Sequence, residues 1–276
     1  MNYFDCHADT LTEIVKPGDS LDENSGDLDL RRAGDFVEKY TQIFAVWKDA
    51  EKLDREDPDR DFLRLYHRAM AYLEDENRKI ALCHNGAEME KAHRQGKAAA
   101  FLSIEDLSVM GKHIETAYEM GFRFAMPAWN YENKYACGAA VDQTKGLTSE
   151  GKAIVKTLTE QGIVIDVSHL SDQGVDDLFE ITDRPIMASH SDIREVWNMP
   201  RNIQKCHLAE LICRKGLIGM NFCAAFVGEK PQISDLLKHM DAVLEMGGED
   251  CLAIGGDFDG CNGHFPEGIN GVQSIP

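Results

Sequence analysis

Residues 162–192 read GIVIDVSHLSDQGVDDLFEITDRPIMASHSD, and in this stretch two short apolar runs flank a helical pattern. The first run, Ile163–Val167, is rich in β-branched residues and is typical of a buried strand. The apolar residues of Val175–Phe179 recur at the i, i+3, i+4 spacing of a helix, and Pro185–Ala188 begins a second strand. The stretch therefore predicts a strand, a helix and a second strand, the repeating unit of parallel α/β proteins.

Each strand of this unit is followed by a histidine. His169 and His190 stand at the carboxyl ends of their strands, the edge on which parallel α/β proteins build their sites. Two imidazoles on neighbouring strands can converge on one metal ion. Two buried histidines that hydrogen-bond loop backbone would give the same pattern, so this unit alone leaves both interpretations open.

Length leaves one α/β barrel as plausible as two domains, and composition indicates a soluble protein. The chain has 276 residues, of which 43% are hydrophobic, and single α/β barrels reach about 250 residues. No segment approaches the roughly 18 consecutive apolar residues of a membrane span. We therefore expect a protein that does not enter a membrane, and the number of predicted strands given below favours a single barrel domain over residues 1–276.

The net charge, the N-terminal residues and the cysteines indicate which partners and which cell compartment to expect. The formal net charge of −19 repels phosphate backbones, so we do not expect nucleic acid as a partner. The start, MNYFDCHADT, has neither the basic nor the apolar region of a secretory signal, which favours a cytoplasmic protein. The eight cysteines form no CxxC pair and stand in apolar contexts, so we expect reduced thiols that serve in packing.

A helical pattern, a glycine and an apolar run recur along the chain, around Gly121, Gly162, Gly216 and Gly247. Glycine just past a helix supplies the left-handed residue that ends it, and the repetition is typical of alternating βα units. The predicted strands begin near Asn2, Thr41, Ala98, Phe122, Ile163, Pro185, Leu217 and Cys251. Eight such strands with intervening helices predict an α/β fold, a (β/α)8 TIM-type barrel.

Two of the intervening helices are well marked. Asp59 to about Lys79 is charged and amphipathic, and Thr148–Gln161 begins with an N-cap threonine and an acidic first turn. The polar residues 16–32 predict a long loop over the carboxyl face of the barrel.

Residues of metal-binding type follow other predicted strands as well. His7 and Asp9 follow the first strand, Asn2–Phe4, and residues i and i+2 of an extended segment face the same side. Glu105 ends the third strand, and Asp257 ends the eighth. Alternatives exist for these positions, because Asp9 is also suited to cap a helix and Glu105 to begin a solvated loop.

In a barrel, six residues of these types share one rim: His7, Asp9, Glu105, His169, His190 and Asp257. Histidines and carboxylates together suit Zn²⁺ or a similar divalent ion. Five ligands exceed the need of one catalytic zinc, so the pattern predicts two ions that share a carboxylate. A water that bridges two such ions is acidified and becomes a hydroxide nucleophile. One carboxylate must then stay free to move protons.

Long loops at the same face carry the predicted substrate contacts. The loop after the fourth strand contains Trp129 and Asn130, and long loops on this face usually line substrate pockets. The loop after the sixth strand contains Arg194 and Arg201, the only cations near the predicted site. A surface position is the alternative for either arginine.

These motifs, in this order and spacing, resemble the renal (membrane) dipeptidase family of the amidohydrolase superfamily, in its bacterial form. They are DCHAD at 5–9, IEDL at 104–107, IDVSHLS at 165–171, PIMASHSD at 185–192, RN at 201–202 and IGGDFDG at 254–260. Each motif is short, and their combination is what makes the match specific. The resemblance implies a binuclear zinc dipeptidase, a metallopeptidase that hydrolyses the peptide bond of a dipeptide.

The resemblance also implies a role for each residue. The metal ligands would be His7 and Asp9 for one zinc ion, Glu105 as the bridge, and His169 with His190 for the other ion. Arg201 would grip the terminal carboxylate of the dipeptide, for which a guanidinium fork is suited. Asp257 would be the general acid/base that delivers a proton to the leaving amine.

The chain departs from the family pattern in two places. Mammalian members have a histidine in the loop after the fourth strand that assists at the substrate carbonyl, and Trp129 stands at that position here, as in many bacterial-looking members. The chain also ends at Pro276, where the family usually continues into further helices. We therefore expect the C-terminal helices to be shortened or missing, and a homo-oligomer in which a second subunit covers the last strand.

Two other functions fit parts of the pattern. Another amidohydrolase-type hydrolase or deaminase would act on a cyclic amide or a nucleobase, but that branch commonly opens with His-x-His and often bridges its metals with a lysine. This chain has His7-x-Asp9 and Glu105 instead. A barrel that binds a metal or a peptide without catalysis would be expected to have lost ligands, and all six positions are filled.

Overall fold

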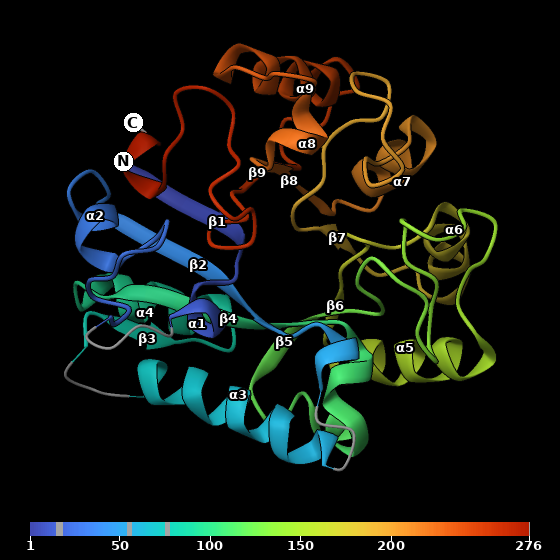
Figure 1. Ribbon diagram of the computed structural model, residues 1–276, viewed down its shortest axis with the longest axis horizontal. Coiled ribbons are helices and arrows are strands. Elements are labelled where there is room, and N and C mark those ends of the chain that lie inside the picture. The colour runs from blue at the N-terminus through green and yellow to red at the C-terminus, as the bar shows by residue number, and fades with distance from the viewer. Residues whose placement is uncertain (15–18, 54–56, 75–77, 276) are drawn as a thin grey trace.

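The sheet of this protein closes on itself. The computed structural model describes residues 1–14, 19–53, 57–74 and 78–275. In these residues, nine parallel strands form one sheet in the order β6-β5-β4-β2-β1-β9-β8-β7, with β3 beside β4 (Figure 1). An isolated parallel bridge between Asp166 and Met187 joins the β6 and β7 ends of this order. The fold is therefore a (β/α)8 barrel, as the sequence predicts.

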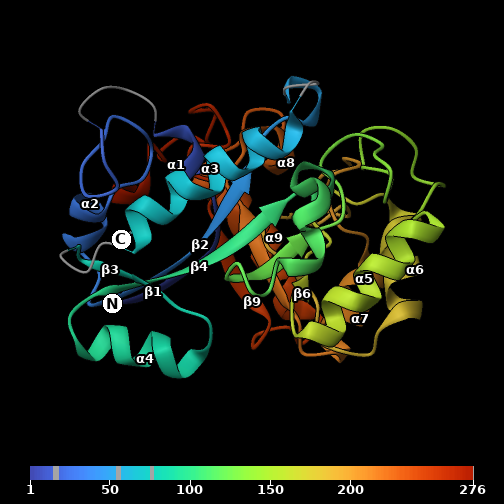
Figure 2. The same cartoon turned by 90° about the horizontal axis from the view of Figure 1, so that it is seen from below.

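The strands are β1 (Asn2–Ala8), β2 (Lys39–Trp47), β3 (Ile80–Leu82), β4 (Ala98–Glu105), β5 (Phe122–Met126), β6 (Val164–Ile165), β7 (Met187–Ala188), β8 (Leu217–Asn221) and β9 (Leu252–Gly255). The α-helices are α1 (Thr10–Glu13), α2 (Leu30–Gly34), α3 (Pro58–Leu73), α4 (Gly86–Arg94), α5 (Ser149–Gln161), α6 (Asp172–Ile181), α7 (Lys205–Cys213), α8 (Ala224–Val227) and α9 (Ile233–Glu245). The 3-10 helices are η1 (Ala50–Lys52), η2 (Leu107–Thr116) and η3 (Val272–Ser274). The longer helices pack outside the strands, α3 against β2 and α5 against β6 (Figure 2).

Local sequence signals place the helix ends around the central unit. Thr148 caps α5 by accepting a hydrogen bond from the backbone N–H of Gly151, and Gly162 ends the helix with a φ of 100°. Gly216 was expected to play the same part after α7, but Lys215 takes the positive φ, 56°. Gly216 is needed for space, because a Cβ there would lie 2.2 Å from the carbonyl oxygen of Ile186.

Several predicted boundaries differ from the observed ones. β1 continues to Ala8, so His7 lies within the strand instead of after it. Helix α3 ends at Leu73, earlier than the expected end near Lys79, and β3 follows it beside β4 outside the barrel. Part of the loop expected over residues 16–32 lies outside the described residues.

Two buried apolar clusters fill the fold. The larger cluster lies between strands and helices and includes Phe62 and Phe122. The smaller one combines Cys6, Phe101 and Met187, which come from strands around the barrel, so it fills the barrel interior. Five of the eight cysteines are buried. Cys206 and Cys213, the second and the last residue of α7, are exposed, contrary to the expected packing role.

The last strand is covered by its own chain. β9 pairs with β8 on one side and β1 on the other, and α9 packs against β8 and β9. The following segment returns to the N-terminal region, where the backbone N–H of Val272 donates to the carbonyl of Asp27. Cover by a second subunit is thus not required for β9. None of the helices in the described residues combines the length and apolarity needed to cross a bilayer.

Candidate active site

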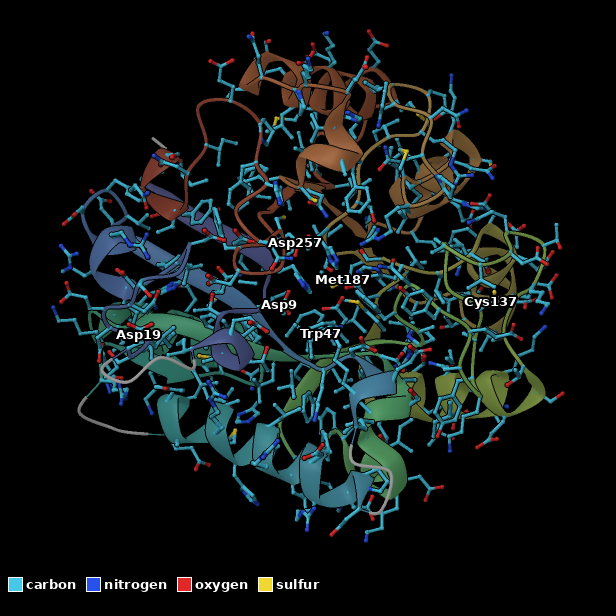
Figure 3. All side chains as sticks on the ribbon, viewed as in Figure 1. Asp9, Asp19, Trp47, Cys137, Met187 and Asp257 are labelled. Carbon is cyan, nitrogen blue, oxygen red and sulfur yellow. The ribbon has the colours of Figure 1, made fainter. Side chains whose placement is uncertain are left out.

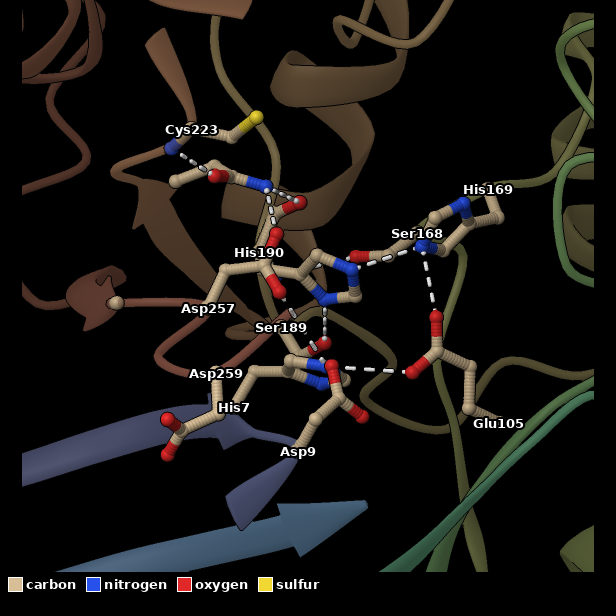
Figure 4. A network of polar contacts seen from close by, with 12 residues as sticks. His7, Asp9, Glu105, Ser168, His169, Ser189, His190, Cys223, Asp257 and Asp259 are labelled. Atoms are coloured by element: carbon tan, nitrogen blue, oxygen red, sulfur yellow. Dashed lines mark hydrogen bonds and ion pairs between the residues drawn. The ribbon is translucent and has the colours of Figure 1, made fainter. Parts of the chain in front are cut away.

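Six side chains of metal-binding type meet at the carboxyl end of the barrel (Figure 4). They are His7 and Asp9 at the end of β1, Glu105 at the end of β4, His169 after β6, His190 after β7 and Asp257 after β9. Three overlapping groups of three bring their ligand atoms within 4.8 Å of one another. Each residue is at most 8% exposed. Because the ligand atoms lie so close together, the sequence prediction that these residues share one rim is confirmed.

Glu105 lies between two histidines. Its Oε2 is 3.2 Å from His7 Nε2, and its Oε1 is 2.9 Å from His169 Nε2. His169 Nε2 is also 2.8 Å from His190 Nε2, while His7 Nε2 is 3.6 Å from Asp9 Oδ2. One carboxylate therefore joins a His7–Asp9 pair to a His169–His190 pair, which is the arrangement that a bridging ligand requires.

Neighbouring polar groups orient two of the imidazoles. His169 Nδ1 lies 2.8 Å from Asn130 Oδ1, and His190 Nδ1 lies 2.7 Å from Ser189 Oγ. An amide oxygen only accepts, so His169 Nδ1 carries the proton and His169 Nε2 presents its lone pair to the centre of the cluster, while the Ser189 hydroxyl holds the His190 ring in place. Asn130, predicted as a substrate contact, faces a histidine ring with its amide oxygen and also lines the cavity described below.

Burial and mutual charge shift the acidity of the cluster. Burial raises the pKa of Glu105 to about 8, the negative charge of Asp9 adds to this effect, and His7 opposes it. Burial likewise raises the pKa of Asp257 to about 6. Burial lowers the pKa of His7, but Glu105 and Asp9 outweigh it and raise that pKa well above the usual value. Carboxylates packed this closely repel one another when they are ionised, unless a positive charge lies between them.

The pKa values of the other two histidines, His169 and His190, are lowered. Burial, followed by the positive charge of Arg201, lowers the pKa of His169 well below its usual value. Burial and the charge of His7 do the same for the pKa of His190. Both imidazoles are therefore neutral at pH 7, the form in which histidine binds a metal.

Unsatisfied polar atoms indicate that the cluster fits a cation. Within the described residues, both ring nitrogens of His7, Asp9 Oδ1 and Glu105 Oε2 are buried without a hydrogen-bond partner. Buried polar atoms normally have partners, and two Nε2 lone pairs 2.8 Å apart repel each other unless a proton or metal lies between them. The mixed nitrogen and oxygen donors are those of a divalent ion such as Zn²⁺.

A cavity of about 470 Å³ opens onto the cluster. Its lining includes Asp9, Glu105, Trp129, Asn130, His169 and Asp257 from the predicted site, together with Glu13, Trp47, Asp49, Lys52, Cys223, Phe226, Asp259, Gly260 and Asn262. The Trp47 and Trp129 rings lie 5.2 Å apart and form one wall. Figure 3 shows Asp9, Trp47 and Asp257 grouped near the middle of the molecule, with Asp19 and Cys137 farther out.

Asp257 faces both the cavity and the cluster. Its Oδ2 accepts a hydrogen bond of 3.1 Å from Asn221 Nδ2, and its Oδ1 lies 3.9 Å from His7 Nε2. Its φ of 53°, like the 70° of His169, is a left-handed conformation that non-glycine residues rarely adopt and that is concentrated at functional sites. Asn221 was missed at the sequence level, although a polar residue at the end of an apolar strand was the signal used for Glu105.

The two arginines differ in role. Arg194 forms a bidentate ion pair with Asp172, at 2.6 and 2.8 Å, and so joins its loop to the start of α6. Arg201 is buried and donates to two neutral acceptors, Ser191 Oγ at 2.9 Å and the His190 carbonyl at 3.0 Å, while its Nε lies 3.1 Å from His169 Nδ1. Arg201 is not among the described residues that line the cavity, but it contacts two that are, His169 and Phe226, with its guanidinium carbon 5.6 Å from the Phe226 ring centre.

Asp259 is a second residue that sequence reasoning did not assign. It accepts 2.6 Å hydrogen bonds from Thr10 Oγ1 and from the backbone N–H of Asp27, and burial raises its pKa to about 6. These contacts hold the segment after β9 against α1 and against the loop before α2. Its place in IGGDFDG, two residues after Asp257, was the available signal.

Comparisons with known proteins agree with this arrangement. The model of the family described as Membrane dipeptidase (Peptidase family M19) matches residues 1–276. An uncharacterized protein encoded in the pqqA 5' region of Klebsiella pneumoniae is 27% identical over 213 residues, which cover 72% of this chain and 78% of its own. An uncharacterized dipeptidase of Schizosaccharomyces pombe is 30% identical over 166 residues, 58% of this chain and 40% of that protein. This chain thus spans well under two thirds of the fungal relative.

Solved structures share the fold. A metallopeptidase from Rhodobacter sphaeroides, liganded with a phosphinate mimic of the dipeptide L-Ala-D-Ala, superposes with a TM-score of 0.87 at 23% identity, over 100% of this chain and 90% of that one. Dipeptidase AC, a metallopeptidase of family M19, also gives 0.87, at 24% identity over 100% and 89% of the two chains.

Proposed function

The chain belongs to the membrane dipeptidase family, peptidase family M19, and from this premise we propose that it is a dipeptidase that uses two divalent metal ions, Zn²⁺ by preference. The observation that carries the proposal is the convergence of six buried ligand-type side chains on a cavity of about 470 Å³. Pockets of roughly 300–1,000 Å³ are typical of sites for small molecules such as a dipeptide.

The proposed ligands divide between the two ions. His7 and Asp9 would hold one ion, His169 and His190 the other, and Glu105 would bind both. Bound there, the ions would polarise the peptide carbonyl and lower the pKa of a water molecule between them. The protein's part is to aim these ligands at one centre, where bound ions would take the place of the protons that Glu105 and His7 retain in the ion-free fold.

Asp257 would carry the proton. Its carboxylate lines the cavity, Asn221 holds one oxygen, and the other oxygen faces the cluster. A pKa raised to about 6 by burial suits a group that takes a proton from the attacking water and gives it to the leaving amine near neutral pH.

Arg201 would bind the terminal carboxylate of the dipeptide. The two hydrogen-bond acceptors named above for the buried guanidinium are neutral, so an anionic group of the substrate can pair with it directly. When His169 Nδ1–H donates to Asn130, Nδ1 cannot also accept from Arg201, so the Nε–H of Arg201 is left for another acceptor.

Two variants separate these roles. Asp257→Asn keeps the shape of the side chain and removes its titration, so kcat on a good dipeptide should fall by about 10²–10⁴ while both metals stay bound. Arg201→Ala removes a contact to a part of the substrate that does not react, so KM should rise more than kcat falls.

A dipeptide amide serves as the matched substrate, because it lacks the terminal carboxylate. The parent enzyme should cleave it poorly, and Arg201→Ala should lose little further activity on it. If Asp257→Asn keeps near-parental kcat, or the amide is cleaved as well as the acid, the mechanism is wrong and a broader amidohydrolase activity becomes the better interpretation.

A further inference from the structure

Two neighbouring strand pairs of the barrel share very little backbone pairing. Among the described residues, β6 and β7 meet only at the isolated bridge between Asp166 and Met187. Strands β1 and β9 share the register pair Asp5–Ile254, and the two segments meet again past the end of β9, where Ala8 bridges Phe258 and the backbone N–H of Asp257 donates to the His7 carbonyl at 3.2 Å. By contrast, β2 and β4 share a continuous register from Thr41 to Trp47. Backbone pairing therefore does little to fix the strand ends at the β6–β7 seam, while at the β1–β9 seam it is sparse within the strands and resumes beside the site.

The proposed site residues flank both seams. His169 and His190 follow β6 and β7, and their Nε2 atoms lie only 2.8 Å apart. His7 and Asp257 lie at the carboxyl ends of β1 and β9. Backbone pairing thus holds His169 and His190 only weakly against each other, whereas His7 and Asp257 also share the backbone hydrogen bond from the Asp257 N–H to the His7 carbonyl.

A buried aspartate spans each seam with one oxygen atom. Asp166 Oδ1 accepts hydrogen bonds from the backbone N–H of Ser168, at 2.9 Å, and of Ser189, at 3.0 Å. Ser168 immediately precedes His169, and Ser189 immediately precedes His190. The two histidines are therefore tied to one carboxylate oxygen through their preceding residues.

Asp5 repeats this geometry at the other seam. Its Oδ1 accepts from the backbone N–H of His7, at 3.0 Å, and of Gly256, which precedes Asp257, also at 3.0 Å. Its Oδ2 accepts from Tyr3 Oη at 2.7 Å. Asp5 and Asp166 are both fully buried, and hydrogen bonds to a charged acceptor are shorter and stronger than neutral ones.

We propose that Asp166 and Asp5 are positioning residues that set the spacing of the site residues across these two seams, each through one carboxylate oxygen shared by both sides. Asp166 sets His169 against His190, and Asp5 sets His7 against Asp257. The inference rests on the proposed function, because it assumes that these residues bind metal ions and move the proton. Groups that hold metal ligands in place typically change metal affinity by about 10- to 100-fold when removed.

Zinc affinity separates positioning from general stability. Asp166→Ala should weaken one of the two bound ions by about 10- to 100-fold, measured by competition with a chromophoric chelator, and leave the other unchanged. Asp166→Asn retains an Oδ1 that accepts both N–H groups and should recover most of that affinity. When His169→Ala is already present, adding Asp166→Ala should lower the zinc affinity little further, because the ion that Asp166 supports is already lost.

Asp177 provides the matched control. It is a buried carboxylate that accepts from the backbone N–H of Leu147 at 2.8 Å and pairs with Lys152, but it belongs to α6 and makes none of its contacts with the cluster. Asp177→Ala should lower the unfolding temperature while both zinc affinities stay parental.

The outcomes decide the inference separately from the function. If the parent binds two zinc ions and cleaves dipeptides, but Asp166→Ala keeps both affinities or weakens both ions equally, the positioning role is wrong and the function stands. If the parent binds no zinc, the proposed function fails. If Asp166→Ala does not fold, the same test is made at the other seam by comparing Asp5→Ala with Asp5→Asn. The kcat of Asp5→Ala must then be lower than that of the parent, and the kcat of Asp5→Asn must be close to it.

Discussion

Removing the metal ions should make the stability of this protein fall as the pH rises above neutrality. Burial raises the pKa of Glu105 from 4.5 to about 8 in the ion-free fold. In the unfolded chain the same carboxyl is already ionised at pH 7. The folded state therefore binds one more proton than the unfolded state, and stability decreases with pH until the folded pKa is passed.

The size of the effect follows from that single proton. A difference of one proton gives a slope of about 1.4 kcal/mol per pH unit, and partial ionisation near pH 8 reduces the loss between pH 7 and 8 to about 1 kcal/mol. For a chain of this size, this corresponds to a decrease of about 2–4 °C in Tm. His7, whose pKa is raised, acts in the same direction, and the lowered pKa values of His169 and His190 act only below about pH 6.5.

Thermal unfolding of dialysed, metal-free protein between pH 7 and 8 measures this slope, with Glu105→Gln as the control. Glutamine cannot ionise, so metal-free Glu105→Gln should be more stable than the parent at pH 8 and show a flatter pH dependence. Zinc-saturated parent should show the reverse slope, because metal binding releases protons. If the Tm of the metal-free parent stays level or rises from pH 7 to 8, the pKa of Glu105 is not raised by its buried position among carboxylates, and the reasoning is refuted.

Three further predictions concern the metals, the barrel and assembly. Purified protein should contain about two divalent ions per chain, and His169→Ala should lose one of them by elemental analysis; no bound metal, with no activity on adding zinc, would count against the two-metal site. Gly255→Ala should destabilise the fold by about 1–3 kcal/mol or more in denaturant unfolding, because its Cβ would lie 1.9 Å from the Ser189 carbonyl. Gly34→Ala, with nothing within 4 Å of the new Cβ, should be neutral or stabilising by comparison. Light scattering at micromolar concentration should find a homo-oligomer, since α9 exposes Ile233, Leu237 and Leu244, and a sharp monomer would contradict this.

The sequence was most informative where a residue's position along a strand determined its place in space. Parallel strands end at one face, so a histidine or carboxylate at each strand end was enough to predict that His7, Glu105 and His190 would meet. Helix caps were equally local, and Thr148 and Gly162 act as predicted. These inferences needed no knowledge of how the strands pair.

What the sequence did not give depends on contacts between distant segments. Arg201 and Arg194 stand in one loop, and only the fold shows that Asp172 pairs with Arg194 while Arg201 is buried behind His169. The apolar runs at 163–167 and 185–188 predicted longer strands than β6 and β7, because periodicity reports burial but not backbone pairing. For the same reason, the hydrogen bonds of Asp166 across that seam could not be foreseen.

The short strands and the site are connected by one physical argument. A strand that stops pairing frees its backbone to turn toward the barrel axis, which allows His169 to take a positive φ and both histidines to point at one centre. The freed N–H groups must still be satisfied in the interior, and the carboxylate of Asp166 accepts two of them. The negative charge that this adds lies next to a cluster already rich in carboxylates. Divalent ions bound by residues of β1, β4, β6 and β7 would balance that charge and would also connect strands that the sheet joins weakly, so metal binding should stabilise the rim of the barrel more than its base.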